Sequence, residues 1–449
     1  MRLVIVVGGG EVGFHLAERL SEEIQDVVLI DSSAARAEDV GNRLDIMTVV
    51  GNGASLSVLE KAGINDAKMV LAVTSVDEVN LIASLAARRL GVEYVAARIS
   101  SPEYYQKTSV LSGDALGIDL MINPERECAR ETFELIRSEV ATEVASFAGG
   151  RVRLIGLKVK EGAWVAGKSL RQLGTELGDD HHYVTAAIQR GKETILPSGE
   201  DTIEEGDHVY LLSPQGELAD IPQLAGYEPF NLKRVMIAGG TPEGYHIAKL
   251  LEENGVEATI IERDRKRCVE LAEALPKALV LNGDATDLEL LEMEGVAGMD
   301  AFVASTGNDQ TNLLSSLLAK TVGARKVVSL IDDFSYLQLI PRLDIDASVS
   351  PRLSTVNAIL RDVRGESITS VATLKGIDAE AIEFEVGEGS HIVGKRLGDV
   401  HFPHGGILGM LVRGDEVFAP QGDTVLNAGD IAVVFALPTC IRDIEKLFA

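Results

Sequence analysis

The feature that most constrains the fold of this 449-residue chain is that its sequence contains the same plan twice. The segment "GNGASLSVLEKAGINDAKMVLAVTSVDEVNLIASLAARRLG" (51–91) aligns with "GDATDLELLEMEGVAGMDAFVASTGNDQTNLLSSLLAKTVG" (283–323) at an offset of 232 residues. A glycine turn precedes each copy, as "VVGGGEVG" (6–13) and as "IAGGTPEG" (237–244). Self-similarity of this length predicts one structural unit used twice, so both copies should fold alike.

A smaller second segment follows each copy. "VAGKSLRQL" (165–173) corresponds to "IVGKRLGDV" (392–400), and short alternating runs with Gly-Asp turns follow both. Such runs predict small strands and hairpins rather than βαβ units. We therefore predict four domains in the order A, B, A′, B′: a first nucleotide-binding domain at 1–123, a linking helix and small domain at 124–228, a second nucleotide-binding domain at 229–350, and a second linking helix and small domain at 351–449.

Within A, apolar strands of four to six residues alternate with predicted helices at about 10–20, 56–63 and 78–90. Buried apolar strands separated by helices indicate a parallel sheet covered on both faces. The predicted fold class is therefore α/β, with two Rossmann-like, doubly wound parallel-sheet domains, each followed by a small α+β domain.

The first glycine turn has the context of a dinucleotide site, because a strand precedes it, a helix follows it, and Asp31 ends the next strand. Gly8 would permit the tight turn, Gly10 would let a pyrophosphate approach the backbone, and Gly13 would let helix and sheet pack closely. The helix N-terminus offers N–H groups to phosphates. Asp31 would accept hydrogen bonds from ribose hydroxyls and repel a 2′-phosphate, which favours NAD(H) or an adenine nucleotide over NADP.

Further polar residues follow the strands of A, at the edge where open α/β sheets bind ligands. Asn52 follows the third strand, Thr74 and Ser75 follow the fourth, and Arg98 ends the fifth. Helix capping by Thr74 and by Asp77, and a solvated charge at Arg98, explain these residues equally well. The second copy has Glu262, Asp284 and Thr306 at the matching positions. Thr241, Pro242 and Leu330 replace Gly10, Glu11 and Arg98, so occupied and vacant second sites both stay open.

Other functions find little support. The formal net charge of −27 disfavours nucleic-acid and anionic-membrane binding. The three cysteines have no metal or disulfide spacing. "GDDHHY" (178–183) could supply metal ligands, but its counterpart "DVHFPHGG" does not keep the spacing. No segment has 18 consecutive uncharged apolar residues, and the N-terminus resembles a strand rather than a signal peptide. We find no catalytic motif, and therefore expect no catalytic residue and no metal.

The repeated segment and its echo resemble the domains that regulate potassium conductance, known as RCK or KTN domains. The A-B-A′-B′ order over almost the entire chain resembles the tandem-RCK subunits of Trk potassium uptake systems. That resemblance implies NAD(H) or ATP/ADP binding by the A domains, a ring, expected to be a homotetramer, and a membrane partner of the TrkH or TrkG type. It also implies a helix linking A to B at 126–141 and at 352–365, and a cytoplasmic location beneath the membrane. The implied contacts are, in the first copy, Gly8, Gly9, Gly10, Glu11, Val12, Asp31, Asn52, Thr74, Ser75 and Arg98, and in the second copy Gly239, Gly240, Thr241, Pro242, Glu243, Glu262, Asp284 and Thr306.

The predicted function is that of a nucleotide sensor, in which a ligand shifts the shape of a ring and thereby gates potassium uptake. Two alternatives remain. An NAD-dependent oxidoreductase would need a unique substrate domain, whereas B is duplicated. A nucleotide-binding regulator of another membrane transporter would differ only in its partner.

Overall fold

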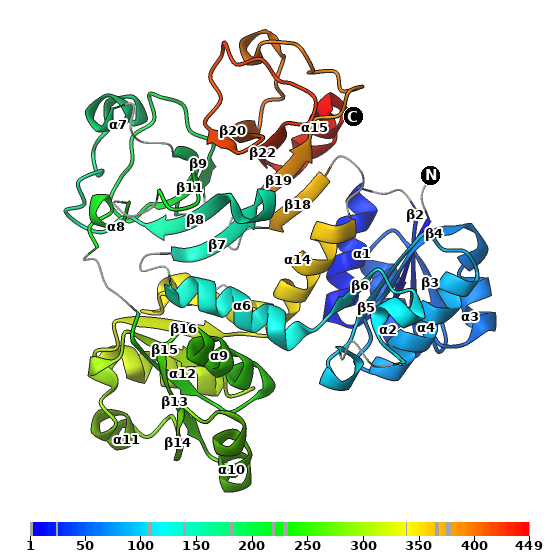
Figure 1. Ribbon diagram of the computed structural model, residues 1–449, viewed down its shortest axis with the longest axis horizontal. Helices are drawn as coiled ribbons and strands as arrows, with labels where there is room; N and C mark the ends of the chain where they lie inside the picture. Colours follow the sequence, from blue (N-terminus) through cyan, green and yellow to red (C-terminus); the bar gives the residue numbers. More distant parts are fainter. Residues whose placement is uncertain are drawn as a thin grey trace. The chain divides into compact units, whose positions relative to one another are not determined.

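The structure is a computed structural model that describes residues 3–23, 26–105, 110–137, 141–178, 183–191, 193–217, 221–227, 232–337, 339–363, 368–373 and 379–448. The chain forms two compact units. One comprises Met1–Cys128 and Ser350–Asp362, and the other comprises Ala129–Val349 and Val363–Ala449. Figure 1 labels their helices and strands.

The first unit contains a six-stranded parallel sheet in the order β3-β2-β1-β4-β5-β6. The strand order reverses at β1, which is the arrangement of a Rossmann domain, and ligands bind such sheets at the carboxyl ends beside the reversal. The central strands are buried because helices cover both faces. The strands are β1 (Leu3–Val7), β2 (Asp26–Asp31), β3 (Met47–Val50), β4 (Ala67–Ala72), β5 (Tyr94–Arg98) and β6 (Leu120–Ile122).

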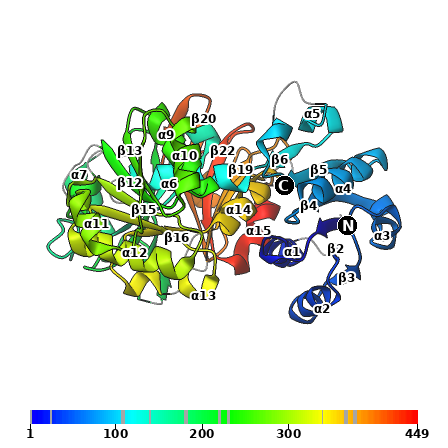
Figure 2. The same cartoon turned by 90° about the horizontal axis from the view of Figure 1, so that it is seen from below.

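The helices of this domain lie on opposite faces of its sheet. The helices α1 (Glu11–Glu23) and α2 (Ala34–Arg43) lie on one face, and α4 (Asp77–Arg89) packs on β4 and β5 on the other (Figure 2). The three predicted helices are confirmed with small shifts of their bounds. The α2 helix was missing from the sequence prediction. Shorter helical elements are α3 (Leu56–Lys61), η1 (Ile64–Asp66), η2 (Pro102–Tyr105) and α5 (Gly113–Leu116).

The second unit repeats this sheet in the order β14-β13-β12-β15-β16-β17. The repeat is exact at the turn, since Gly8 N donates to Ile30 O and Gly239 N donates to Ile261 O, both at 2.8 Å. Its elements are β12 (Arg234–Ala238), α9 (Pro242–Glu253), β13 (Glu257–Glu262), α10 (Arg265–Ala274), β14 (Leu279–Asn282), α11 (Leu288–Met293), η4 (Val296–Gly298), β15 (Ala301–Ala304), α12 (Asp309–Val322), β16 (Lys326–Leu330), α13 (Phe334–Leu337), η5 (Ile340–Arg342) and β17 (Ala347–Val349).

Both small domains also lie in the second unit, and each has a five-stranded antiparallel sheet with the same strand order, β10-β9-β11-β8-β7 and β21-β20-β22-β19-β18. The first consists of β7 (Ala141–Phe147), η3 (Ala148–Gly150), β8 (Val152–Lys158), α7 (Leu170–Leu177), β9 (Val184–Arg190), β10 (Glu193–Ile195), β11 (His208–Pro214) and α8 (Ile221–Leu224). The second consists of β18 (Ile368–Thr373), β19 (Glu380–Glu385), η6 (Leu397–Asp399), β20 (Gly406–Arg413), β21 (Glu416–Phe418), β22 (Ile431–Ala436), η7 (Pro438–Cys440) and α15 (Ile441–Phe448).

The two small domains share one hydrophobic core. Leu154, Tyr210 and Leu212 of the first pack in the same cluster as Met410 and Phe435 of the second. The rings of Tyr210 and Phe435 lie 6.5 Å apart between centroids. The A-B-A′-B′ prediction of paired α/β and α+β domains is thereby confirmed, with B and B′ joined through a common core.

The two linking helices lie with the Rossmann domain of the opposite half. The helix α14 (Pro351–Val363) follows the second Rossmann domain, yet Ser350–Asp362 belongs to the first unit. There the Tyr94 hydroxyl donates to the Asp362 carboxylate. The helix α6 (Pro124–Arg137) follows the first Rossmann domain, and its Leu135 carbonyl accepts a 2.5 Å hydrogen bond from the buried Lys326 ammonium of β16.

Candidate nucleotide-binding site

The first glycine turn connects β1 to α1 in a conformation that only glycine adopts easily. Gly8 has φ 109°, and a Cβ there would lie 3.0 Å from the backbone nitrogen of Thr74. A Cβ on Gly13 would lie 1.7 Å from the Gly8 carbonyl oxygen, so this position requires glycine for helix and strand to approach. A Cβ on Gly10 would meet no atom within 4 Å, so the space above that residue is open.

Asp31 ties the turn to the end of β2. Its Oδ2 accepts a hydrogen bond from Gly9 N at 2.7 Å, and its Oδ1 accepts one from Ser33 N at 2.8 Å. The side chain is 6% exposed, and the Arg36 guanidinium lies 3.6 Å from Oδ2. Because each carboxylate oxygen has two lone pairs, the carboxylate can shape the turn and still accept hydrogen bonds from a ligand.

The first turn of α1 offers hydrogen-bond donors. In the described part of the chain no acceptor bonds the N–H groups of Val12 and Gly13. Open N–H groups at the positive end of a helix dipole are the feature by which helix starts bind phosphates, so this is the candidate position for a pyrophosphate. Glu11 begins this helix, and its carboxylate forms an ion pair with Arg352 of α14.

The other first-copy candidates lie at the carboxyl ends of neighbouring strands. Asn52 is exposed, and its Oδ1 accepts a hydrogen bond from Ala54 N at 2.9 Å. Ser75 is exposed beside Thr74. The Arg98 guanidinium is half-buried and has no hydrogen bond or ion pair with any residue that the structure describes, which leaves its five donors available to an anion.

Helix capping was the alternative explanation for Thr74 and Asp77, and it is wrong for both. The N-cap of α4 is Val76, which makes no side-chain cap. Thr74 Oγ1 donates to Asn80 Oδ1 at 2.7 Å, and Asp77 accepts hydrogen bonds from the backbone N–H groups of the loop after β5. Both residues join strand ends to each other instead.

Asn80 is a site residue that the sequence analysis missed. It is fully buried, its Oδ1 accepts from Thr74 N at 2.9 Å, and its Nδ2 donates to Thr74 O at 2.9 Å and to Arg98 O at 2.7 Å. It therefore holds the ends of β4 and β5 together. Asn312 does the same in the second copy, bonding Thr306 N and Leu330 O, both at 2.7 Å. Identical residues at an offset of 232 were the signal that could have revealed this pair.

The second copy preserves the turn and its acidic partner. Gly239 has φ 107°, and Gly240 N donates to Glu262 Oε2 at 2.7 Å. Glu262 Oε1 accepts from Asp264 N at 2.7 Å, which matches the contact between Asp31 and Ser33. The acidic side chain thus has the same place and the same two backbone contacts in both halves.

The start of the helix differs between the copies. Thr241 is the N-cap of α9, where its hydroxyl accepts a hydrogen bond from Gly244 N at 3.2 Å and donates to Ser305 O at 3.0 Å. Pro242 occupies the first turn and has no N–H, and Glu243 follows it. In α9 the N–H group of Gly244 is therefore already hydrogen-bonded to Thr241, and Pro242 contributes no N–H group.

The remaining second-copy positions also differ from the first. Asp284 Oδ1 accepts from Thr286 N at 2.9 Å, and hydrogen bonds from that residue lower the pKa of the Asp284 carboxyl. Thr306 repeats the contacts of Thr74 by donating to Asn312 Oδ1 at 2.7 Å. Leu330, which is buried, replaces the available cation Arg98. The second copy therefore presents fewer groups suited to a phosphate than the first.

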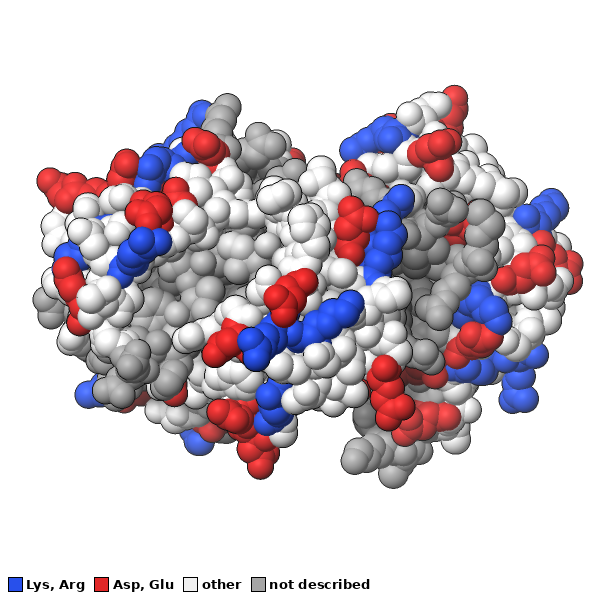
Figure 3. All heavy atoms as spheres, turned by 90° about the horizontal axis from the view of Figure 1, so that it is seen from above, with Lys and Arg blue, Asp and Glu red and all other residues white. Residues whose placement is uncertain are grey.

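In the described part of the chain, no group of three or more His, Cys, Asp or Glu side chains is placed so that it could hold a metal ion. Asp179–His182, which the sequence analysis considered as possible metal ligands, lie outside the described residues. The three cysteines are free and buried. On the face shown in Figure 3, Lys and Arg are scattered among Asp and Glu and form no basic patch. Among the described helices, none has the length and apolar character needed to cross a membrane.

Comparison with known proteins agrees with this architecture. The family model of the TrkA-N domain matches residues 4–124 and 235–351, and that of the TrkA-C domain matches 154–225 and 381–449. The "Trk system potassium uptake protein TrkA homolog 1" of Methanosarcina mazei is 37% identical over 452 residues, covering 99% of both chains. The corresponding TrkA of Halomonas elongata is 36% identical over 451 residues, covering 99% of this chain and 98% of its own.

A solved structure shows the same fold. "GsuK channel bound to NAD" aligns with a TM-score of 0.61 and 17% identity, covering 100% of this chain and 79% of that chain. Two copies of both domain types and extensive identity to curated relatives define the family, which is a family of RCK-type regulatory subunits and not of enzymes. The chain belongs to the TrkA family of Trk system potassium uptake proteins.

Proposed function

We propose that this chain is a nucleotide-sensing regulatory subunit that gates potassium uptake through a membrane transporter of the TrkH or TrkG type. The observation that carries the proposal is the first glycine turn. It combines an open approach at Gly10, a buried acceptor at Asp31, and N–H groups at the start of α1 and a cation at Arg98 that have no partner among the described residues. The glycine turn, the helix start and the acidic residue are the features that bind a dinucleotide in Rossmann domains, and a cation such as Arg98 would add attraction to the phosphates.

NAD(H) is the proposed ligand of the first copy. The backbone N–H groups of α1 would bind the pyrophosphate and Asp31 the ribose hydroxyls, whereas the negative charge of Asp31 opposes the 2′-phosphate of NADP. ATP or ADP would use the same phosphate and ribose groups and is the alternative ligand. The second copy keeps Glu262 for ribose but has Thr241 and Pro242 at the helix start, so we propose weaker binding there.

The proposed coupling between site and regulation runs through α14. Arg352 of this helix pairs with Glu11 at the first turn of α1, and Asp362 near its end accepts a hydrogen bond from Tyr94. Phosphates bound at α1 would compete with Glu11 for Arg352, so binding would favour one position of α14. About 1–3 kcal/mol of differential affinity is typical of such coupling.

Assembly completes the proposal. We propose a homotetrameric ring at the cytoplasmic face of the cell membrane, held there by the transporter. The ring would change shape with the nucleotide, and the nucleotide would leave chemically unchanged.

The test is rubidium uptake into proteoliposomes that contain a TrkH-type subunit and this chain, with NADH, NAD, ATP or ADP added in turn. Gly10→Thr places a side chain in open space at the helix start and should abolish the response to nucleotide. Gly387→Thr is the matched control, because a Cβ there also meets nothing within 4 Å. The proposal is wrong if none of the nucleotides changes the rate of rubidium uptake, or if NADH is steadily consumed.

A further inference from the structure

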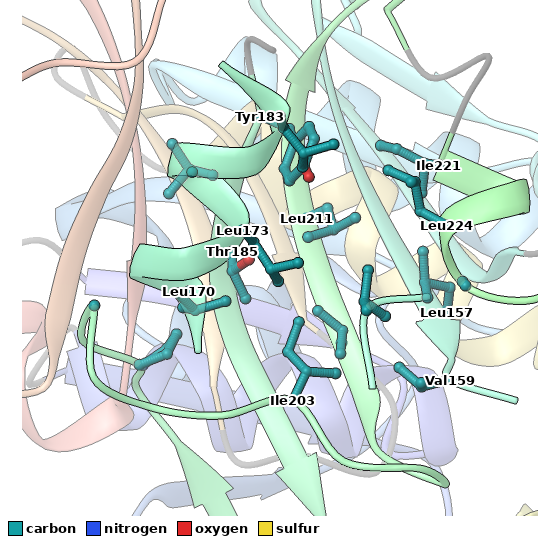
Figure 4. A pocket seen from close by; sticks show the side chains of 18 of the residues that line it. Leu157, Val159, Leu170, Leu173, Tyr183, Thr185, Ile203, Leu211, Ile221 and Leu224 are labelled. Carbon is teal, nitrogen blue, oxygen red and sulfur yellow. The ribbon is translucent and has the colours of Figure 1, made fainter. Parts of the chain in front are cut away.

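The first small domain contains an apolar cavity that the nucleotide site does not use. Its volume is about 330 Å³, within the range of small-molecule pockets. Leu170 and Leu173 of α7 surround it from one side and Ile221 and Leu224 of α8 from the other (Figure 4). Among the described residues that line it, none is Asp, Glu, Lys, Arg or His.

In the second small domain two stacked aromatic rings lie at the matching place. Phe384 on β19 and Phe448 on α15 stack with ring centroids 4.4 Å apart and an interplanar angle of 12°. Both rings are buried in the core of that domain. They bring α15 tightly against the sheet.

The internal repeat identifies what replaces these rings in the first domain. Leu157 pairs with Val209 in the sheet as Phe384 pairs with Ala432, so Leu157 stands where Phe384 stands. Aligning "IPQLA" (221–225) with "IEKLF" (444–448) places Ala225 where Phe448 stands. Leu157 and Ala225 both line the cavity. The cavity is therefore the volume that a stacked phenyl pair occupies in the other copy.

Empty apolar cavities are costly, and they accept apolar molecules rather than water. An engineered cavity of about 150 Å³ binds benzene, and this one is about twice as large. Polar groups are few: the Tyr183 hydroxyl, Thr185 and Ser198 lie among the lining residues. Burial raises the pKa of Tyr183 to about 12, so its hydroxyl remains a neutral hydrogen-bonding group.

We propose that the first small domain binds a small uncharged molecule with one or two aromatic rings, held between α7, α8 and the sheet. The ligand would occupy the place of the Phe384–Phe448 pair. The site is separate from the nucleotide site, and the first small domain supplies all its described lining residues except Ile407 of β20. A charged ligand is disfavoured, because it would lose its hydration without gaining an ionic partner among the described lining residues.

The test is calorimetric titration of the full-length chain with indole, a neutral bicyclic probe, and with indole-3-acetate, its charged analogue. Saturable binding of about one indole per chain is expected, with indole-3-acetate at least about tenfold weaker. Ala225→Phe and, separately, Leu157→Phe restore one ring each and should abolish indole binding. Val269→Phe adds a ring at an exposed position outside the cavity and should leave binding unchanged.

The reciprocal variant checks the logic of the repeat. Phe448→Ala should open a matching cavity in the second small domain and add a second indole equivalent. If the native chain does not bind indole saturably, or if folded Ala225→Phe and Leu157→Phe chains bind it as the native chain does, the proposal is wrong. Circular dichroism establishes that each variant is folded.

Discussion

Replacing Asn80 should loosen the ligand-binding edge of the first Rossmann domain although the residue is fully buried. The Asn80 side chain makes four hydrogen bonds, of 2.7–2.9 Å, to Thr74 and to the carbonyl of Arg98. A hydrogen bond contributes about 1 kcal/mol net, and a buried group left unpaired costs about 1–3 kcal/mol. Thr74 is half-buried, so water can reach part of the vacated space. We therefore expect Asn80→Ala to lower the free energy of opening of this part of the domain by about 3 kcal/mol.

Hydrogen exchange measured by mass spectrometry locates this loss. A change of about 3 kcal/mol corresponds to about a hundredfold faster exchange of amides in β4 and β5, provided that they open together. Asn312→Ala should produce the same effect in β15 and β16 and leave β4 and β5 unchanged. Asn254→Ala is the surface control, because the exposed Asn254 side chain makes a single hydrogen bond to the described residues, of 2.8 Å to Leu250 O. The reasoning is refuted if Asn80→Ala accelerates exchange no more than Asn254→Ala does.

Three further predictions concern binding and pH. Thr241→Gly frees the Gly244 N–H from its cap and should strengthen NADH binding at the second site by about threefold to tenfold, measured by calorimetry; unchanged or weaker affinity would contradict our account of that site. Arg98→Ala should weaken NADH binding and reduce its salt dependence, while Arg89→Ala, at the end of α4, should change neither. Burial, aided by the charge of Lys158, lowers the pKa of His208 in the folded chain. As the pH falls, the unfolded chain therefore binds a proton at His208 before the folded chain does. The first small domain should lose stability as the pH falls through about 6.5 and should keep its full stability above that pH. Fluorescence of Trp164, the single tryptophan, can follow unfolding of this domain. His208→Gln should make the stability of the domain less dependent on pH, and an unchanged pH dependence would contradict this prediction.

The fold could be predicted well from the sequence because each helix and strand occurs twice, so the pattern in one half could be checked against the pattern in the other. The Gly8 and Gly239 turns were recognisable since glycine spacing and the following helix reflect local backbone geometry. Helix bounds shifted by a few residues where left-handed glycines intervene, as at Gly63 with φ 84°. The exchange of α6 and α14 between the halves was not predictable, because a helix pattern shows which face is apolar and not which domain covers it.

The sequence pointed to the glycine turns and their acidic partners as a candidate site, but not to the contacts that support them. Asp31 and Glu262 followed from their distance to the glycine turn. Asn80 and Asn312 were overlooked because they lie inside apolar helix patterns, where a polar residue suggests no partner until the strand ends are placed. The replacement of Gly10 by Thr241 was noted from the sequence, but its role as the N-cap of α9 became evident only in the structure. Composition likewise gave no sign that Leu157 and Ala225 leave a cavity.

The most direct test of the central claim is calorimetric titration of the native chain with NADH, followed by recovery and analysis of the nucleotide. We predict saturable binding without turnover, lost from the stronger site in Gly10→Thr and retained in Gly387→Thr. Absence of binding, or equal binding by Gly10→Thr and the native chain, would contradict the claim that this glycine turn senses a nucleotide.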